Sequence, residues 1–165
     1  MYDVVRWLER SFHRVKIARY AMPPIAQMSS QRFVIEAEYF YPCCNSTLVA
    51  TGNNLLDAFR RACKFLWVGR DINEPWWCVK VPSAISWFLR VRKTVSDAEV
   101  RFYRYRNRIR CKALFRLAKR QQAIRGVGEG YTAEAAIKTA AWQVMERYGK
   151  LRRALAASRK SVGAD

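Results

Sequence analysis

The stretch that decides the fold is RIRCKALFRL at residues 108–117, together with GEGYTAEAAIKTAAWQVMERY at residues 128–148. In the first stretch apolar and basic residues alternate, apart from Leu114, and this period of two predicts a strand with one buried face. The second stretch opens on two glycines and Thr132, after which apolar residues recur at helical spacing. It predicts a sharp turn followed by a helix that Thr132 caps and whose small apolar side packs on a sheet.

The remaining elements are predicted from the same two periodicities, and both halves of the chain give the same order. In the first half we expect a helix over residues 2–15, strands over 16–22, 32–41 and 46–50, and a helix over 55–69 that Asn53 or Asn54 can cap. In the second half we expect a helix over residues 83–95, strands over 99–106, 108–117 and 122–127, and a helix that begins after Thr132. The prediction is therefore an α+β protein of two α-β-β-β-α units, each a three-stranded antiparallel sheet packed on two helices.

Matching residues in the two halves indicate a duplication. Three pairs are each 78 residues apart and a fourth pair is 80 apart: Gly52 and Gly130, Ala58 and Ala136, Ala62 and Ala140, and Trp7 and Trp87. A period near 80 is typical of a repeated structural unit. The predicted boundaries are 1–69 for the first unit, 70–82 for a linker, 83–150 for the second unit and 151–165 for a basic tail.

The chain is strongly basic, and its charge is unevenly distributed. It has 165 residues, with 31 Lys and Arg against 13 Asp and Glu, for a net charge of +18. Residues 1–75 contribute +3 and residues 76–165 contribute +15. Because 51% of the residues are apolar, a disordered polycation is excluded. The second half is the predicted surface for an anionic polymer, and the nearly neutral first half is predicted to dimerise or to contact a protein partner.

The start of the last helix resembles the double-stranded RNA-binding domain, a family with an α-β-β-β-α fold. The residues that carry the resemblance are Gly128, Gly130, Thr132, Ala136, Ala140 and Ala141. The resemblance implies this fold and RNA as the partner. Where the family places phosphate-binding lysines, however, the chain has Ala133, Glu134 and Ile137, and the family's Gly-Pro-x-His loop has no counterpart. RNA contacts are therefore expected on other surfaces of the second half.

Thirteen basic residues are the candidate nucleic-acid contacts, because their charges neutralise phosphates. They belong to the strand 108–117 and its following turn, to the helix 83–95, and to the last helix and tail: Arg108, Arg110, Lys112, Arg116, Lys119, Arg120, Arg90, Arg92, Lys93, Lys138, Lys150, Arg152 and Arg153. Tyr103 and Tyr105 are candidate platforms on which bases stack. The sequence leaves open whether the RNA is duplex or single-stranded.

Other chemistry finds little support in the sequence. The five cysteines have no paired spacing and there is one histidine, His13, so we predict no zinc site, no other metal and no cofactor. No catalytic motif is present, so we predict no enzyme. There is no apolar stretch of about 20 residues, so no membrane span is predicted. Scattered cysteines suggest an intracellular, reducing compartment, cytoplasmic or ribonucleoprotein-associated.

Two other functions stay compatible with the same residues. One is a structural component of a ribosome or another ribonucleoprotein, where basic chains with arginine-rich tails are common. The other is a small protein-binding inhibitor or adaptor of the phage or viral type, because the segment Gly130–Ala135 also suits the turn before a helix in such proteins.

Overall fold

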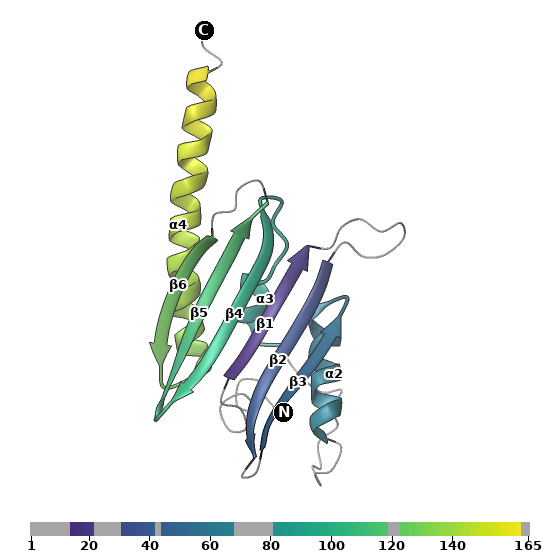
Figure 1. Cartoon of the computed structure of the whole chain (residues 1–165). Coiled ribbons are helices and arrows are strands. Elements are labelled where there is room, and N and C mark those ends of the chain that lie inside the picture. Colours follow the sequence, from purple (N-terminus) through teal and green to yellow (C-terminus); the bar gives the residue numbers. More distant parts are fainter. Residues whose placement is uncertain (1–13, 22–30, 42–43, 68–80, 119–122, 163–165) are drawn as a thin grey trace.

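The computed structural model describes residues 14–21, 31–41, 44–67, 81–118 and 123–162 (Figure 1). The elements are β1 (Arg14–Ala21), β2 (Gln31–Tyr41), β3 (Cys44–Gly52), α2 (Leu55–Trp67), α3 (Ser83–Phe88), β4 (Val95–Tyr105), β5 (Arg108–Leu117), β6 (Ala123–Gly130) and α4 (Ala133–Val162). The α+β class is confirmed.

The prediction of two separate three-stranded sheets is wrong. The six strands form one antiparallel sheet in the order β3-β2-β1-β4-β5-β6, because β1 pairs with β4. This ladder joins Arg14–Arg19 to Ala98–Tyr103, and its central pairs are Lys16 with Arg101 and Ile17 with Val100. Two separate sheets would each leave an exposed edge of unpaired N–H and C=O groups here, and pairing the edges satisfies both. The two halves of the chain therefore share one sheet.

A buried arginine in β1 forms hydrogen bonds with the start of β4, at one end of the β1–β4 ladder. Arg19 is 1% exposed, and its Nη1 and Nη2 atoms donate to the carbonyls of Ser96 and Val95, both at 3.3 Å. Two residues further along β1, the backbone N–H of Ala21 donates to Oδ1 of Asp97 at 3.2 Å. These bonds connect β1 to the irregular start of β4, where the register with β5 shifts. They fix the alignment of the two halves.

The three helices of the described residues, α2, α3 and α4, lie on one face of the sheet, as Figure 1 shows. The core lies between them and the sheet, and its strand positions include Ile17, Ile35, Val100 and Ala113, each at most 1% exposed. Helix α2 packs on β2 and β3, and α4 packs on β5 and β6. The opposite face, which we call the open face, carries none of the three helices. Within the described residues, no helix covers the side chains of the open face.

Two glycines let α4 lie directly on β6. A Cβ atom at Gly126 would stand 2.2 Å from the carbonyl oxygen of Ala140, and one at Gly128 would stand 2.2 Å from that of Ala136. No Cβ approaches a backbone atom so closely, so the helix axis can occupy this place only over glycines. Gly128, one of the residues that resemble the double-stranded RNA-binding domain, thus has a direct role in helix packing.

The two helix starts after β3 and β6 are built alike. Oδ1 of Asn54 accepts from the N–H of Asp57 at 2.8 Å, and Oγ1 of Thr132 accepts from the N–H of Ala135 at 3.2 Å. Asn54 and Thr132 are separated by 78 residues, the offset predicted for the repeat. The predicted caps are confirmed, and the order β-β-β-α occurs twice within the single sheet.

Several predicted boundaries are corrected by the structure. Arg14 and Val15 begin β1 and do not end a helix; the rest of that predicted helix lies outside the described residues. The helix predicted over 83–95 ends at Phe88, because the chain turns and the N–H of Val95 donates to the carbonyl of Arg92 at 3.0 Å. Helix α4 continues without a break past residue 150, the predicted end of the second unit, and through the predicted tail as far as Val162. Most of the predicted linker 70–82 is outside the described residues.

Candidate nucleic-acid interface

Strand β5 presents its basic residues to the open face. Its bounds match the prediction, Arg108–Leu117, and burial alternates along it. The helix-facing residues are Ile109, Cys111, Ala113 and Phe115, all at most 7% exposed. The exposed basic residues on the other face are Arg108, Arg110, Lys112 and Arg116. The sheet therefore holds four candidate contacts in one row along a single strand.

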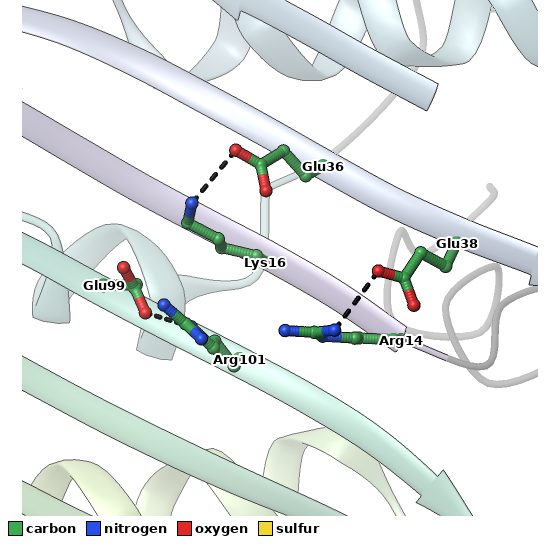
Figure 2. A network of polar contacts seen from close by, with 6 residues as sticks. All are labelled: Arg14, Lys16, Glu36, Glu38, Glu99 and Arg101. Carbon is green, nitrogen blue, oxygen red and sulfur yellow. Dashed lines mark hydrogen bonds and ion pairs between the residues drawn. The ribbon is translucent and has the colours of Figure 1, made fainter. Parts of the chain in front are cut away.

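In the N-terminal half of the open face, two of the three described cations, Arg14 and Lys16, are paired with carboxylates from the neighbouring strand (Figure 2), and the third, Arg32, donates to Oγ1 of Thr51. Nη1 of Arg14 lies 3.3 Å from Oε1 of Glu38, and Nζ of Lys16 lies 3.0 Å from Oε1 of Glu36. Burial lowers the pKa of the Lys16 ammonium, but hydrogen bonds to Tyr20 and Glu36 outweigh it, so the pKa is raised overall. Lys16 thus stays charged and neutralised by its partner.

A similar pair lies at the junction of the halves. On β4, Nε of Arg101 is bonded to Oε1 of Glu99, and this hydrogen bond raises the pKa of Arg101. Glu99 is 7% exposed although it faces the open side, so its carboxylate is largely withdrawn from solvent. An ion pair of this kind offers little net charge to an anionic partner.

The cations of β5 are compensated much less. Arg110 pairs with Glu129 of β6, Nη2 to Oε1, at 2.5 Å. Within the described part of the chain, Arg108, Lys112 and Arg116 have no carboxylate within 4.0 Å. Arg116 stands opposite Asp97 in the ladder, but Oδ1 of Asp97 accepts from the backbone N–H of Ala21. We call Arg108, Lys112 and Arg116 the β5 strip.

The two tyrosines predicted as stacking platforms differ in exposure and in their contacts with cations. The ring of Tyr103 is half-buried between two cations, with the guanidinium carbon of Arg14 at 5.5 Å and Nζ of Lys112 at 5.3 Å from its centroid. Tyr105 is 68% exposed. The guanidinium carbon of Arg106, its neighbour in the hairpin turn, lies 5.5 Å from the centroid of its ring. Tyr105 is therefore the ring with room for a partner.

The β4–β5 hairpin borders a hollow of about 650 Å³ on the open face. Its lining is mainly aromatic and basic: Tyr103, Arg104, Tyr105, Arg108, Arg110, Lys112 and Glu129. Five of these residues are among the predicted contacts. Proteins that bind single-stranded nucleic acids combine aromatic rings, on which bases stack, with positive charges that contact the phosphates.

Tyr131, which follows β6, is not among the contacts predicted from the sequence. It is 75% exposed, and the guanidinium carbon of Arg108 lies 5.5 Å from the centroid of its ring. The pairing of Ile109 with Gly130 brings the end of β6 beside the start of β5 and so places Tyr131 next to Arg108. Strand register was the only signal for this contact, and sequence spacing alone does not give it.

The predicted contacts beside α3 divide into structural and exposed residues. Arg92 is half-buried, and its guanidinium donates to the carbonyls of Phe88, Arg90 and Trp87 at 2.8, 2.9 and 3.1 Å. Burial lowers the pKa of Arg92. These bonds satisfy the carbonyls at the end of a short helix. Arg90 and Lys93 are exposed.

The predicted contacts on α4 lie in the helical layer, away from the open face. Lys138 pairs with Glu134 at 2.7 Å and Lys150 with Glu146 at 2.8 Å, both one turn apart on the helix. The guanidinium of Arg152 lies 5.9 Å from the ring centroid of Tyr148, and Arg153 is exposed. Lys119 and Arg120 lie outside the described residues. Arg90, Lys93, Arg152 and Arg153 also have no carboxylate within 4.0 Å among the described residues. The predicted contacts therefore divide between two faces, and the open face is distinguished by three such cations in one row along a single strand.

The described residues supply no alternative reactive centre. Cys63 and Cys111 are buried free thiols; burial raises the pKa of Cys63 to about 12 and also raises that of Cys111. Both therefore behave as small apolar residues, since thiolates are the reactive form. Over the described ranges, no three potential metal ligands cluster, and no helix has the length and apolar character to cross a membrane. Cys43, His13 and Cys78 lie outside these ranges.

Comparison with known proteins gives no relatives: no family model matches the chain, and no curated protein or solved structure is significantly similar to it.

Proposed function

We propose that this chain is a non-catalytic RNA-binding protein that holds its ligand on the C-terminal half of the open face. The observation that carries the proposal is the β5 strip, three exposed cations that no carboxylate of the described residues neutralises. Such cations gain free energy by displacing the counterions of a phosphate backbone. A surface meant only for solubility would interleave both signs, as β1 and β2 do.

RNA is proposed as the polymer because the start of α4 resembles an RNA-binding family at Gly128, Gly130 and Thr132. The open face differs from the helical surface with which this family contacts RNA. We therefore propose electrostatic contact between the RNA backbone and strand β5. The N-terminal half, where Arg14 and Lys16 are paired with glutamates, is proposed to dimerise or to hold a protein partner. Action in a reducing compartment is proposed because Cys63 and Cys111 are free thiols.

A salt titration tests this proposal. Binding of the full chain to single-stranded RNA, duplex RNA and duplex DNA of equal length is measured between low and physiological salt. Three phosphate contacts predict a slope of about −2 for log K against log salt with the single strand. Absence of binding at low salt, or binding that ignores salt, contradicts the proposal; selective, salt-insensitive capture of one protein would support the adaptor function in its place.

A further inference from the structure

The two most exposed tyrosines of the C-terminal half flank one cation at the end of the open face. Tyr105 of β4 stands directly opposite Arg108 of β5 in the ladder, and Arg108 lies over the ring of Tyr131 at 5.5 Å. Directly opposed residues in an antiparallel pair have Cβ atoms about 5 Å apart. The three side chains thus form a continuous row, tyrosine–arginine–tyrosine, across β4, β5 and the turn after β6.

We propose that Tyr105 and Tyr131 form a stacking site for unpaired nucleobases, with Arg108 between them. The inference rests on the proposed function, which it narrows from RNA in general to single-stranded segments. Exposed fractions of 68% and 75% leave most of each ring free for contact. In a duplex the faces of the bases are covered by their neighbours, so a ring on a sheet surface reaches only a base that is unstacked.

The hollow beside the row suits this ligand in size and in chemistry. Its volume of about 650 Å³ lies in the range of pockets that take small molecules. Lys112 and Arg108 line it and supply positive charge for the phosphates on either side of a stacked base. Glu129, the single acidic residue of the lining, is paired with Arg110.

The hairpin turn adds a second cation at the same place. Arg106 has φ of 52°, a left-handed conformation that glycine or asparagine adopts with less strain. The chain nevertheless has an arginine there, and its guanidinium lies 5.5 Å from the ring of Tyr105. A strained turn residue whose side chain joins a cluster of this kind is consistent with a binding role. Tyr103, in contrast, is occupied by Arg14 and Lys112 and is not part of the stacking site.

The test compares three ligands at low salt: a single-stranded RNA of twelve nucleotides, the same sugar–phosphate chain without bases, and a duplex RNA. The protein variants are the double substitution Tyr105→Leu with Tyr131→Leu, and the control Trp142→Leu. Trp142 is 71% exposed on α4, in the helical layer, so it matches the tyrosines in exposure but lies away from the open face. A second double variant, Tyr105→Phe with Tyr131→Phe, keeps the rings.

We expect the natural protein to bind the base-bearing strand at least about tenfold more tightly than the abasic one, since each stacked base contributes strongly to affinity. The leucine double variant should lose this preference and keep its affinity for the abasic chain, while the phenylalanine and Trp142 variants keep both. Equal binding of the two single strands by the natural protein, or equal losses for both in the leucine variant, overturns the inference and leaves the proposed function intact. Failure to bind any of the three ligands overturns the proposed function itself.

Discussion

The two halves of the open face are built on one sheet from the same order of strands, yet they treat positive charge in opposite ways. On β1, Arg14 and Lys16 each meet a glutamate of β2. On β5 one cation of four, Arg110, has such a partner among the described residues. The charge difference between the halves of the sequence, +3 against +15, is thus reproduced on the surface as a difference in pairing.

This difference shows what a count of charges leaves out. Arg92, Arg101 and Arg110 all contribute to the +15, but the first satisfies backbone carbonyls and the other two are held by carboxylates. The residues available to an anionic ligand are the ones that the fold leaves without an internal partner. For a strand, cross-strand neighbours decide this, and they become visible only with the register.

The largest effect is expected when the charges of the β5 strip are reversed. We expect Arg108→Glu, Lys112→Glu and Arg116→Glu together to weaken RNA binding more than about a hundredfold, because three phosphate contacts become repulsive. Arg110 is left unchanged, since a glutamate there would oppose Glu129 and disturb the sheet. Affinity is measured by fluorescence anisotropy, and circular dichroism confirms that the fold is kept.

The matched control applies the same change of total charge to the other half. Arg32, Arg60 and Lys64 are exposed residues of β2 and α2, and their triple replacement by glutamate should weaken binding much less. Equal losses in the two triple variants would mean that net charge alone governs binding, and the distinction between the halves would not hold.

The C-terminal half of the sheet depends on the close packing of α4 against β6. A methyl group at Gly128 would meet the carbonyl of Ala136 at 2.2 Å, so we expect Gly128→Ala to lower the free energy of unfolding by about 2–3 kcal/mol. The control, Gly149→Ala in the same helix, has no atom within 4 Å of the added carbon and should stabilise by about 0.5–1 kcal/mol. Chemical denaturation measures both. A Gly128→Ala protein as stable as the natural one would show that α4 does not pack closely on β6.

A milder change should make the two halves more alike. Glu38→Gln removes the partner of Arg14 without altering the size of the side chain, and both groups are about half exposed. The freed cation extends the positive surface toward β1, so we expect RNA affinity to rise about twofold to threefold at low salt. Isothermal titration at two salt concentrations checks this, and the gain should shrink at the higher one. An unchanged affinity would show that the ligand does not reach β1.

Local patterns predicted much of the fold. Strand β5 was predicted with correct bounds because strict alternation is a property of neighbouring residues, and Asn54 and Thr132 were recognised as caps for the same reason. The joining of β1 to β4 was not predicted, since edge-to-edge pairing involves residues about 85 positions apart that carry no shared signal. The helix predicted over 83–95 was too long because its apolar spacing continues to Val95, which is buried as a strand residue.

The candidate site was predicted in part for similar reasons. The four β5 cations were placed correctly on one face, but their differing compensation depends on Glu129 and on the ladder to β6. Tyr131 was missed because its proximity to Arg108 follows from that ladder and not from its place in the sequence.

The most direct measurement is the number of phosphates that the β5 strip contacts. Salt titrations with single-stranded RNA are compared for the natural protein and for a variant with Arg108→Gln, Lys112→Gln and Arg116→Gln, which removes charge without reversing it. If the strip binds the backbone, the magnitude of the slope of log K against log salt falls by about 2 in the variant. An identical slope in both proteins would show that the RNA does not touch these residues.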